Sequence, residues 1–230
     1  GHAGEAEHLD RDRRAGGLDR LAALVEQRAH AAVQAGKFRD EIVPVQLAGR
    51  KGPTVFDTDE GVRGDTTLET LAKLKPAFSK EGTVTAGSAS GINDGAAAVV
   101  MTRQSVAEAL GLPILARVVS HAAHAHAPGH FTTAPVPAMQ KTLQKAGWSV
   151  DDVDLWEINE AFAVVPMIAM REMNIDHAKV NVNGGATALG HPIGASGARI
   201  ITTLIAAMKA QGKKKGVASL CIGGGEATAV

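Results

Sequence analysis

The sequence predicts an α/β protein whose strands and helices pack in layers. Two observations support this. First, 45% of the 230 residues are hydrophobic, which is enough to bury a sizeable core. Second, from Leu112 onward apolar runs of strand length alternate with helical patterns. We expect an atypical polar leader at residues 1–17, a loop-rich region at 18–111 and a regular α/β domain at 112–230.

The part before Leu112 is predicted to be poor in regular structure. Apolar residues recur at helical spacing from Leu18 to Ala35, and Gly36 is a typical stop signal. Residues 40–66 are rich in Gly, Pro and Asp, which favours loops. Within and after this stretch we expect a short extended piece at 42–47, short helices at 67–74 and 104–110, and a buried strand in the apolar run 96–101.

The part from Leu112 onward is predicted to be regular. Its alternating pattern places strands at 114–119, 155–158, 180–183 and 217–222, and helices at 136–146, 162–173 and 195–210. The sequence stops at Val230 inside what should be a last strand, so we expect an incomplete sheet edge that exposes apolar surface.

The composition argues against several classes of partner. Lys plus Arg and Asp plus Glu both number 24, so no basic excess is present to bind nucleic acid or an anionic membrane surface. The apolar runs are shorter than the roughly 20 residues that span a bilayer. The leader has no signal-peptide composition. A single cysteine, Cys221, excludes an internal disulfide and favours a cytoplasmic location.

Three motifs follow predicted strands, where α/β folds usually assemble their sites: NEAF at 159–162, GHPIGASG at 190–197 and CIGGG at 221–225. In the second, Gly190 and Pro192 hold His191 on a tight turn at the positive end of a helix dipole. That frame favours a functional histidine over a structural one. Asn159 could cap the following helix or orient a water, and capping is the simpler role.

Cys221 ends an apolar strand and precedes three glycines. Backbone amides of glycines can approach a ligand closely and donate hydrogen bonds to a developing oxyanion, so the thiol could act as a nucleophile or as an acid/base. The alternative is a small buried hydrophobe, which is the common state of a free cysteine.

In this order and spacing, NEAF, GHPIGASG and CIGGG resemble the signature motifs of the thiolase family. The stretches AGKFRDEIVPV, TVTAGSASGINDGAAA and FTTAPVPA extend the resemblance from about Leu21 to Val230. It implies a thiolase-like layered fold, present as the C-terminal half and a loop subdomain that binds coenzyme A (CoA), with most of the N-terminal half missing. The implied activity is acyl transfer between CoA thioesters by Claisen condensation or thiolysis. The resemblance implies no covalently bound cofactor, acyl-CoA substrates and a homo-oligomer.

The resemblance also implies roles for single residues. His191 matches the histidine that activates the nucleophilic cysteine and donates to the thioester oxygen, and Asn159 matches the residue that holds a water in the same oxyanion hole. Cys221 matches the acid/base cysteine, whose unperturbed pKa of about 8.5 suits proton exchange near neutral pH. Gly223 matches the backbone donor of a second oxyanion hole.

The positions that match the family's CoA-binding residues are Arg63, Thr70, Phe78, Ala86 and Ser90. An arginine can stack on a base or meet a phosphate, a phenylalanine can pack on pantetheine or the nucleotide, and a serine can bond the pantetheine amide. Taken singly, the arginine suits a solvated loop, the phenylalanine a core position and the serine a turn.

The family's nucleophilic cysteine belongs to a segment with no counterpart here, because Cys221 already occupies the acid/base position. We therefore expect the isolated chain to be inactive. Two alternatives stay open, a non-catalytic acyl-CoA binding or interaction module and a condensing enzyme of the β-ketoacyl synthase kind. Cys221 within CIGGG argues against the second. The sequence does not separate a biosynthetic role from fatty acid β-oxidation.

Overall fold

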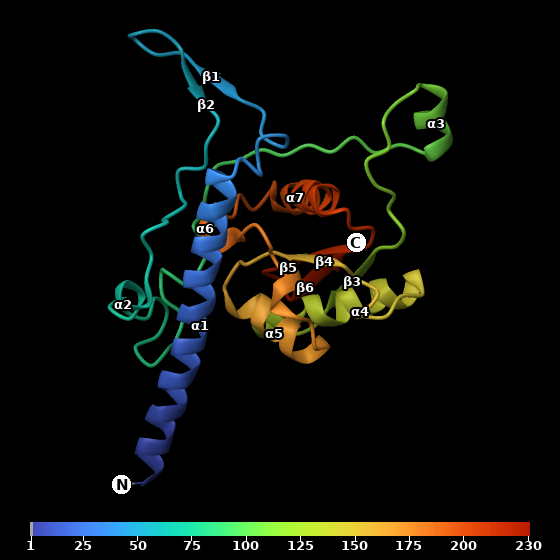
Figure 1. Ribbon diagram of the computed structural model, residues 1–230. Helices are drawn as coiled ribbons and strands as arrows, with labels where there is room; N and C mark the ends of the chain where they lie inside the picture. The colour runs from blue at the N-terminus through green and yellow to red at the C-terminus, as the bar shows by residue number, and fades with distance from the viewer. Residues whose placement is uncertain (1) are drawn as a thin grey trace.

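The computed structural model describes residues 2–230, with side chains described from Gly16 onward. Its centre is a four-stranded sheet in the order β3-β6-β5-β4, covered by α7 on one face and by α4 and α5 on the other (Figure 1). The pair β4 and β5 is parallel, and the other two pairs are antiparallel. These elements are β3 Ala122–Ala125, α4 Pro135–Ala146, β4 Leu155–Ile158, α5 Val164–Met173, α7 Ser196–Gln211, β5 Gly216–Ile222 and β6 Glu226–Ala229.

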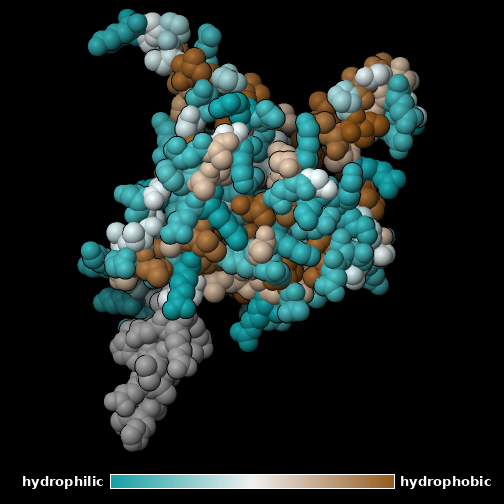
Figure 2. Space-filling view, viewed as in Figure 1, coloured by the Kyte–Doolittle hydropathy of each residue, from teal (hydrophilic) through white to brown (hydrophobic). Residues whose placement is uncertain are grey.

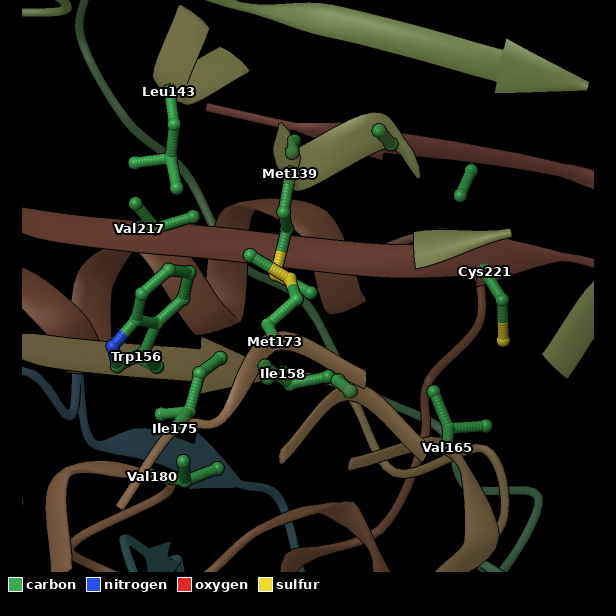
Figure 3. Close-up of a cluster of buried hydrophobic side chains, with 14 of the residues drawn as sticks. Met139, Leu143, Trp156, Ile158, Val165, Met173, Ile175, Val180, Val217 and Cys221 are labelled. Carbon is green, nitrogen blue, oxygen red and sulfur yellow. The ribbon is translucent and has the colours of Figure 1, made fainter. Parts of the chain in front are cut away.

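The main hydrophobic core lies between the sheet and the α4 and α5 layer. Met139 of α4, Trp156 and Ile158 of β4 and Val217 of β5 are buried together there (Figure 3). On the other face, α7 packs Ile200 and other apolar residues against the sheet. Removing this apolar surface from water stabilises the layers, and it fixes the carboxyl ends of β4 and β5 beside each other.

Helix α1 (His2–Gln34) runs along the side of this body (Figure 1). It packs Leu21, Val25 and Ala29 against Ala163 and Ala188, which flank the NEAF and GHPIGASG motifs. The predicted helix is therefore confirmed. Its start at His2 lies inside the polar leader, which the sequence analysis had separated from the helix.

The smaller elements surround or project from the body. They are β1 Val45–Leu47, β2 Thr54–Phe56, α2 Leu68–Leu71, α3 Gln104–Ala109, the 3-10 turns η1 Pro128–Thr133 and η2 His177–Lys179, and α6 Ala186–Leu189. The β1–β2 hairpin and α3 stand away from the sheet and carry hydrophobic surface (Figures 1 and 2). Within the described residues, no helix is both long and apolar enough to cross a membrane.

Two predicted strands are wrong. Residues 96–101 and 114–119 belong to no strand in the described chain, and Val100 is 93% exposed. The first strand of the sheet begins later, at Ala122. An apolar run forms a strand only where a neighbouring strand completes its backbone hydrogen bonds, and these two runs have no such neighbour here. The predicted strand 180–183 is reduced to isolated bridges, from Val180 to Trp156 and from Val182 to Gly184.

The expectation of an incomplete edge at the C-terminus is also wrong. Strand β6 lies inside the sheet, between β3 and β5. Val230 donates to and accepts from Ala218, both at 2.9 Å. Many of the exposed apolar residues lie elsewhere, for example Val55 on the β1–β2 hairpin and Met101 and Leu115 on the segments that flank α3. The predicted helices at 104–110, 136–146 and 195–210 and the strands at 155–158 and 217–222 are confirmed within one or two residues.

Candidate active site

The site is built where the parallel strands β4 and β5 end. Ile158 is paired with Ser219, and the backbone N–H of Asn159 donates to the carbonyl of Ser219 at 2.9 Å. Cys221 lies two residues further along β5. Because parallel strands run in the same direction, Asn159, just after β4, and Cys221, near the end of β5, lie at the same end of the sheet.

His191 reaches this edge from the loop before α7. Its ring Nε2 lies 3.4 Å from Asn159 Nδ2, and its Nδ1 lies 2.6 Å from Ser196 Oγ. Its backbone N–H donates to the Gly91 carbonyl at 3.1 Å and to Asn93 Oδ1 at 3.3 Å. The structure thus brings together two residues for which the resemblance implies one oxyanion hole, and it holds the histidine at both its backbone and its ring.

Asn159 is almost completely buried, with 1% exposure. Its Oδ1 has no hydrogen-bond partner among the described residues, and its Nδ2 faces His191. Helix α5 has Ala163 at its N-cap and no side-chain cap, so the capping alternative for Asn159 is wrong. A buried amide that does not cap a helix is free to orient a group inside the site.

The surroundings of His191 favour its neutral form. Burial is the main effect that lowers the pKa of His191, and the positive charge of Arg199 lowers it further. The preceding Gly190 has φ +88°, and a Cβ there would lie 2.4 Å from Asn93 Oδ1. Only glycine fits this turn, which explains why the motif frames the histidine as it does.

Cys221 is buried, with 6% exposure, and belongs to the main core cluster with Val165 and Ala227. Its thiol points toward Val165 (Figure 3). Burial raises the pKa of Cys221 to about 11, above the unperturbed value assumed from the sequence. The thiol is therefore protonated at neutral pH.

The glycines after Cys221 form the turn between β5 and β6. Gly223 is exposed, and a Cβ there would meet no atom within 4 Å. Gly225 has φ +99°, and a Cβ there would lie 2.3 Å from the His126 carbonyl oxygen. The backbone thus requires glycine at Gly225, whereas the role of Gly223 as an oxyanion donor stays a prediction.

Two of the predicted CoA-binding residues converge on the NEAF motif. Phe78 is 74% exposed and meets the ring of Phe162 edge-on, with 5.7 Å between centroids. Ser90 Oγ donates to the Ala161 carbonyl at 3.0 Å. Phe78 is therefore not a core residue. Together with Phe162 it forms an aromatic surface beside the loop that holds Asn159.

The other three predicted CoA-binding residues have different neighbours. The backbone N–H of Arg63 donates to Glu26 Oε2 on α1 at 2.8 Å. Thr70 Oγ1 accepts from the Thr67 N–H at 3.0 Å and takes part in the capping of α2. Ala86 is exposed on the loop that leads to Ser90. A role for these residues in binding CoA stays a prediction.

Sequence reasoning missed three residues that support the site. Asn93 and Ser196 brace His191, and both lie inside motifs quoted above, where their hydrogen-bonding side chains were the available signal. Glu160, the second residue of NEAF, is buried and accepts from Asn181 Nδ2 at 2.6 Å and from the Thr187 N–H at 3.0 Å. Burial raises the pKa of Glu160. These bonds tie the NEAF loop to Asn181 and to the first turn of α6.

The fold and this site define a thiolase-type protein, and the comparisons agree. The family profile "Thiolase, C-terminal domain" matches residues 112–230 and "Thiolase, N-terminal domain" matches residues 5–105. The chain belongs to the thiolase family. Among the described residues, no group of His, Cys, Asp and Glu could hold a metal ion.

Similar proteins include acetyl-CoA acetyltransferases of Pseudomonas aeruginosa, 54% identical over 213 residues, and of Escherichia coli K12, 52% identical over 212 residues. Each alignment covers 92% of this chain and 54% of the relative, so the chain spans about half the length of these curated relatives. Among solved structures, the Bacillus anthracis acetyl-CoA acetyltransferase aligns with a TM-score of 0.91 at 45% identity. Human mitochondrial 3-ketoacyl-CoA thiolase aligns with a TM-score of 0.87 at 39% identity. Both alignments cover 97% of this chain and 57% of the solved chain.

Proposed function

We propose that this chain supplies the acid/base and oxyanion-binding half of an acetyl-CoA C-acetyltransferase, which transfers acyl groups between CoA thioesters by Claisen condensation and thiolysis. The observation that supports it most is the contact between Asn159 and His191 at the end of the sheet where Cys221 also lies. The names of the similar acetyl-CoA acetyltransferases point to the same reaction.

The chemistry of the site suits this reaction. A neutral His191 can take the proton of an attacking thiol at Nε2 and then donate it to the oxyanion that forms on the thioester. The Asn159 amide, directly or through a water, completes that oxyanion hole. Cys221 holds a proton at neutral pH, because its pKa is about 11, and can deliver it to the enolate that leaves in thiolysis.

The aromatic surface of Phe78 and Phe162 suits the nonpolar parts of CoA. Ser90 uses its hydroxyl proton in the bond to the Ala161 carbonyl, so its oxygen is left to accept from a pantetheine N–H. Arg63 lies on an exposed loop, where its guanidinium can meet a phosphate of the nucleotide end.

A second candidate is binding of acyl-CoA without turnover. It is favoured by the single cysteine of the sequence, because the two-cysteine reaction needs a nucleophile besides the acid/base thiol. Our proposal for the isolated 230 residues is that they bind CoA but do not turn it over. A cytoplasmic location and homo-oligomeric assembly are part of the same proposal.

The test combines calorimetric titration of CoA with thiolysis of acetoacetyl-CoA, using the 230-residue chain. We expect CoA binding without turnover, and binding weakened about tenfold by Phe78→Ala through lost aromatic contact. Phe56→Ala, which removes another exposed phenylalanine on β2, is the matched control and should leave binding unchanged. If the 230-residue chain catalysed thiolysis and Cys221→Ser abolished it, this one thiol would be sufficient for the reaction. If the chain did not bind CoA, both candidate functions would be contradicted.

A further inference from the structure

Ser196 lies at the first position of α7 and is completely buried against the ring of His191. Its Oγ is 2.6 Å from His191 Nδ1 and 3.1 Å from the Pro192 carbonyl oxygen. A serine hydroxyl has one proton to donate and two lone pairs that accept. Which of its two neighbours receives that proton therefore decides what His191 Nδ1 must do.

The Pro192 carbonyl favours one direction of donation, because it can only accept. It accepts from the backbone N–H groups of Ala195 at 2.7 Å and Ser196 at 2.9 Å, and the Ser196 hydroxyl is its third close contact. If Ser196 donated to His191 Nδ1, the hydroxyl and the carbonyl oxygen would face each other at 3.1 Å with no proton between them. If Ser196 donates to Pro192, its oxygen accepts from an Nδ1–H, and every close contact contains one proton. Asn159 Nδ2, also a donor, then faces an Nε2 that accepts.

We propose that Ser196 is a positioning residue that holds neutral His191 in the tautomer with its proton on Nδ1, and so keeps Nε2 unprotonated beside Asn159. Protons are then donated in one direction along the row, from Asn159 through His191 and Ser196 to Pro192. Which ring nitrogen of a histidine carries the proton is set by the hydrogen bond that the other nitrogen makes.

The Nδ1–H tautomer of His191 is the protonation state in which the proposed reaction would start. Only this use of the tautomer rests on the proposed function. With Nε2 unprotonated, the imidazole can accept the proton of an attacking thiol, and the resulting imidazolium can donate from Nε2 to the oxyanion while Nδ1–H stays bonded to Ser196. With the proton on Nε2 from the outset, the same ring could not act as the base.

The test is long-range ¹H–¹⁵N NMR of the 230-residue chain labelled in its histidines, at a pH where His191 is neutral. The His191 signals are identified by their loss in His191→Asn. We expect wild type to show the pattern of the Nδ1–H tautomer. Ser196→Ala should shift the tautomer ratio toward Nε2–H by roughly tenfold, as loss of one buried hydrogen bond implies, and Ser196→Thr should restore the wild-type pattern.

Thr202→Ala is the matched control. Thr202 makes the same kind of bond on the same helix, from its Oγ1 to the Ala198 carbonyl four residues earlier at 3.0 Å, but not to His191. It should leave the His191 pattern unchanged. The proposal would be overturned if the wild-type protein showed the pattern of the Nε2–H tautomer, or if Ser196→Ala left the tautomer ratio unchanged. Neither result depends on whether Ser196→Thr folds. Because the readout needs neither turnover nor CoA, failure here is distinct from failure of the proposed function.

Discussion

Replacing Glu157 with glutamine should change how the stability of the protein depends on pH. Glu157 lies in β4 and is 2% exposed, with Arg199 Nη1 3.9 Å from its Oε2. Burial raises the pKa of Glu157 to about 8, an effect larger than the lowering by Arg199. In the unfolded chain a glutamate has a pKa of about 4.3. Between these two values the folded state holds a proton that the unfolded state has lost.

The sign follows from this difference. Because the folded-state pKa is raised, the contribution of Glu157 to stability is fully present below about pH 4 and is lost as the pH rises toward 8. The loss amounts to about 1.4 kcal/mol for each pH unit within that window. Glu157→Gln cannot ionise and should not show this loss. The amide beside Arg199 can also change the free energy of unfolding by an amount that does not depend on pH. Such a change moves the plot of this free energy against pH up or down without altering its slope.

The assay is urea unfolding followed by tryptophan fluorescence, at pH values from 5 to 8. The free energy of unfolding of Glu157→Gln minus that of wild type should rise by about 1.4 kcal/mol per pH unit. Titrating groups that do not interact with Glu157 cancel in the difference. Glu172→Gln, which removes an exposed carboxylate from α5, should give a flat difference. A flat difference for Glu157→Gln as well would refute the claim that burial keeps this carboxyl protonated.

Three further predictions concern the core and the thiol. Met139→Ala should lower the free energy of unfolding by about 2–5 kcal/mol, since Met139 is fully buried, whereas Met101→Ala, at a residue 73% exposed, should change it by less than about 0.5 kcal/mol in the same urea assay. Gly185→Ala should destabilise the chain and lower its melting temperature, because the new Cβ would lie 2.2 Å from the Glu160 carboxyl group, and an unchanged melting temperature would contradict this close packing. Alkylation of Cys221 by iodoacetamide at pH 8 should be more than about a hundredfold slower than that of a free cysteine and should accelerate in urea, because a pKa of about 11 leaves little thiolate. Rapid alkylation of the folded chain would contradict this.

The sequence by itself determined the elements whose patterns are local. Helices α3, α4 and α7 and strands β4 and β5 follow from periodicity and turn residues and lie where they were predicted. The three motif loops could be recognised from their residue types. The placement of Asn159 and His191 in one site came from the resemblance of their motifs to those of the thiolase family.

Only the tertiary structure decided what depends on partners distant in sequence. The apolar runs 96–101 and 114–119 look like strands, but a strand forms only beside another backbone that completes its hydrogen bonds. Neither run has such a neighbour, whereas β3, which follows them in the chain, pairs with β6. Likewise, the contact of Ser196 with His191 and the raised pKa values of Glu157 and Cys221 come from burial and through-space neighbours. Burial and desolvation are properties of the packed molecule, so no single stretch of sequence contains them.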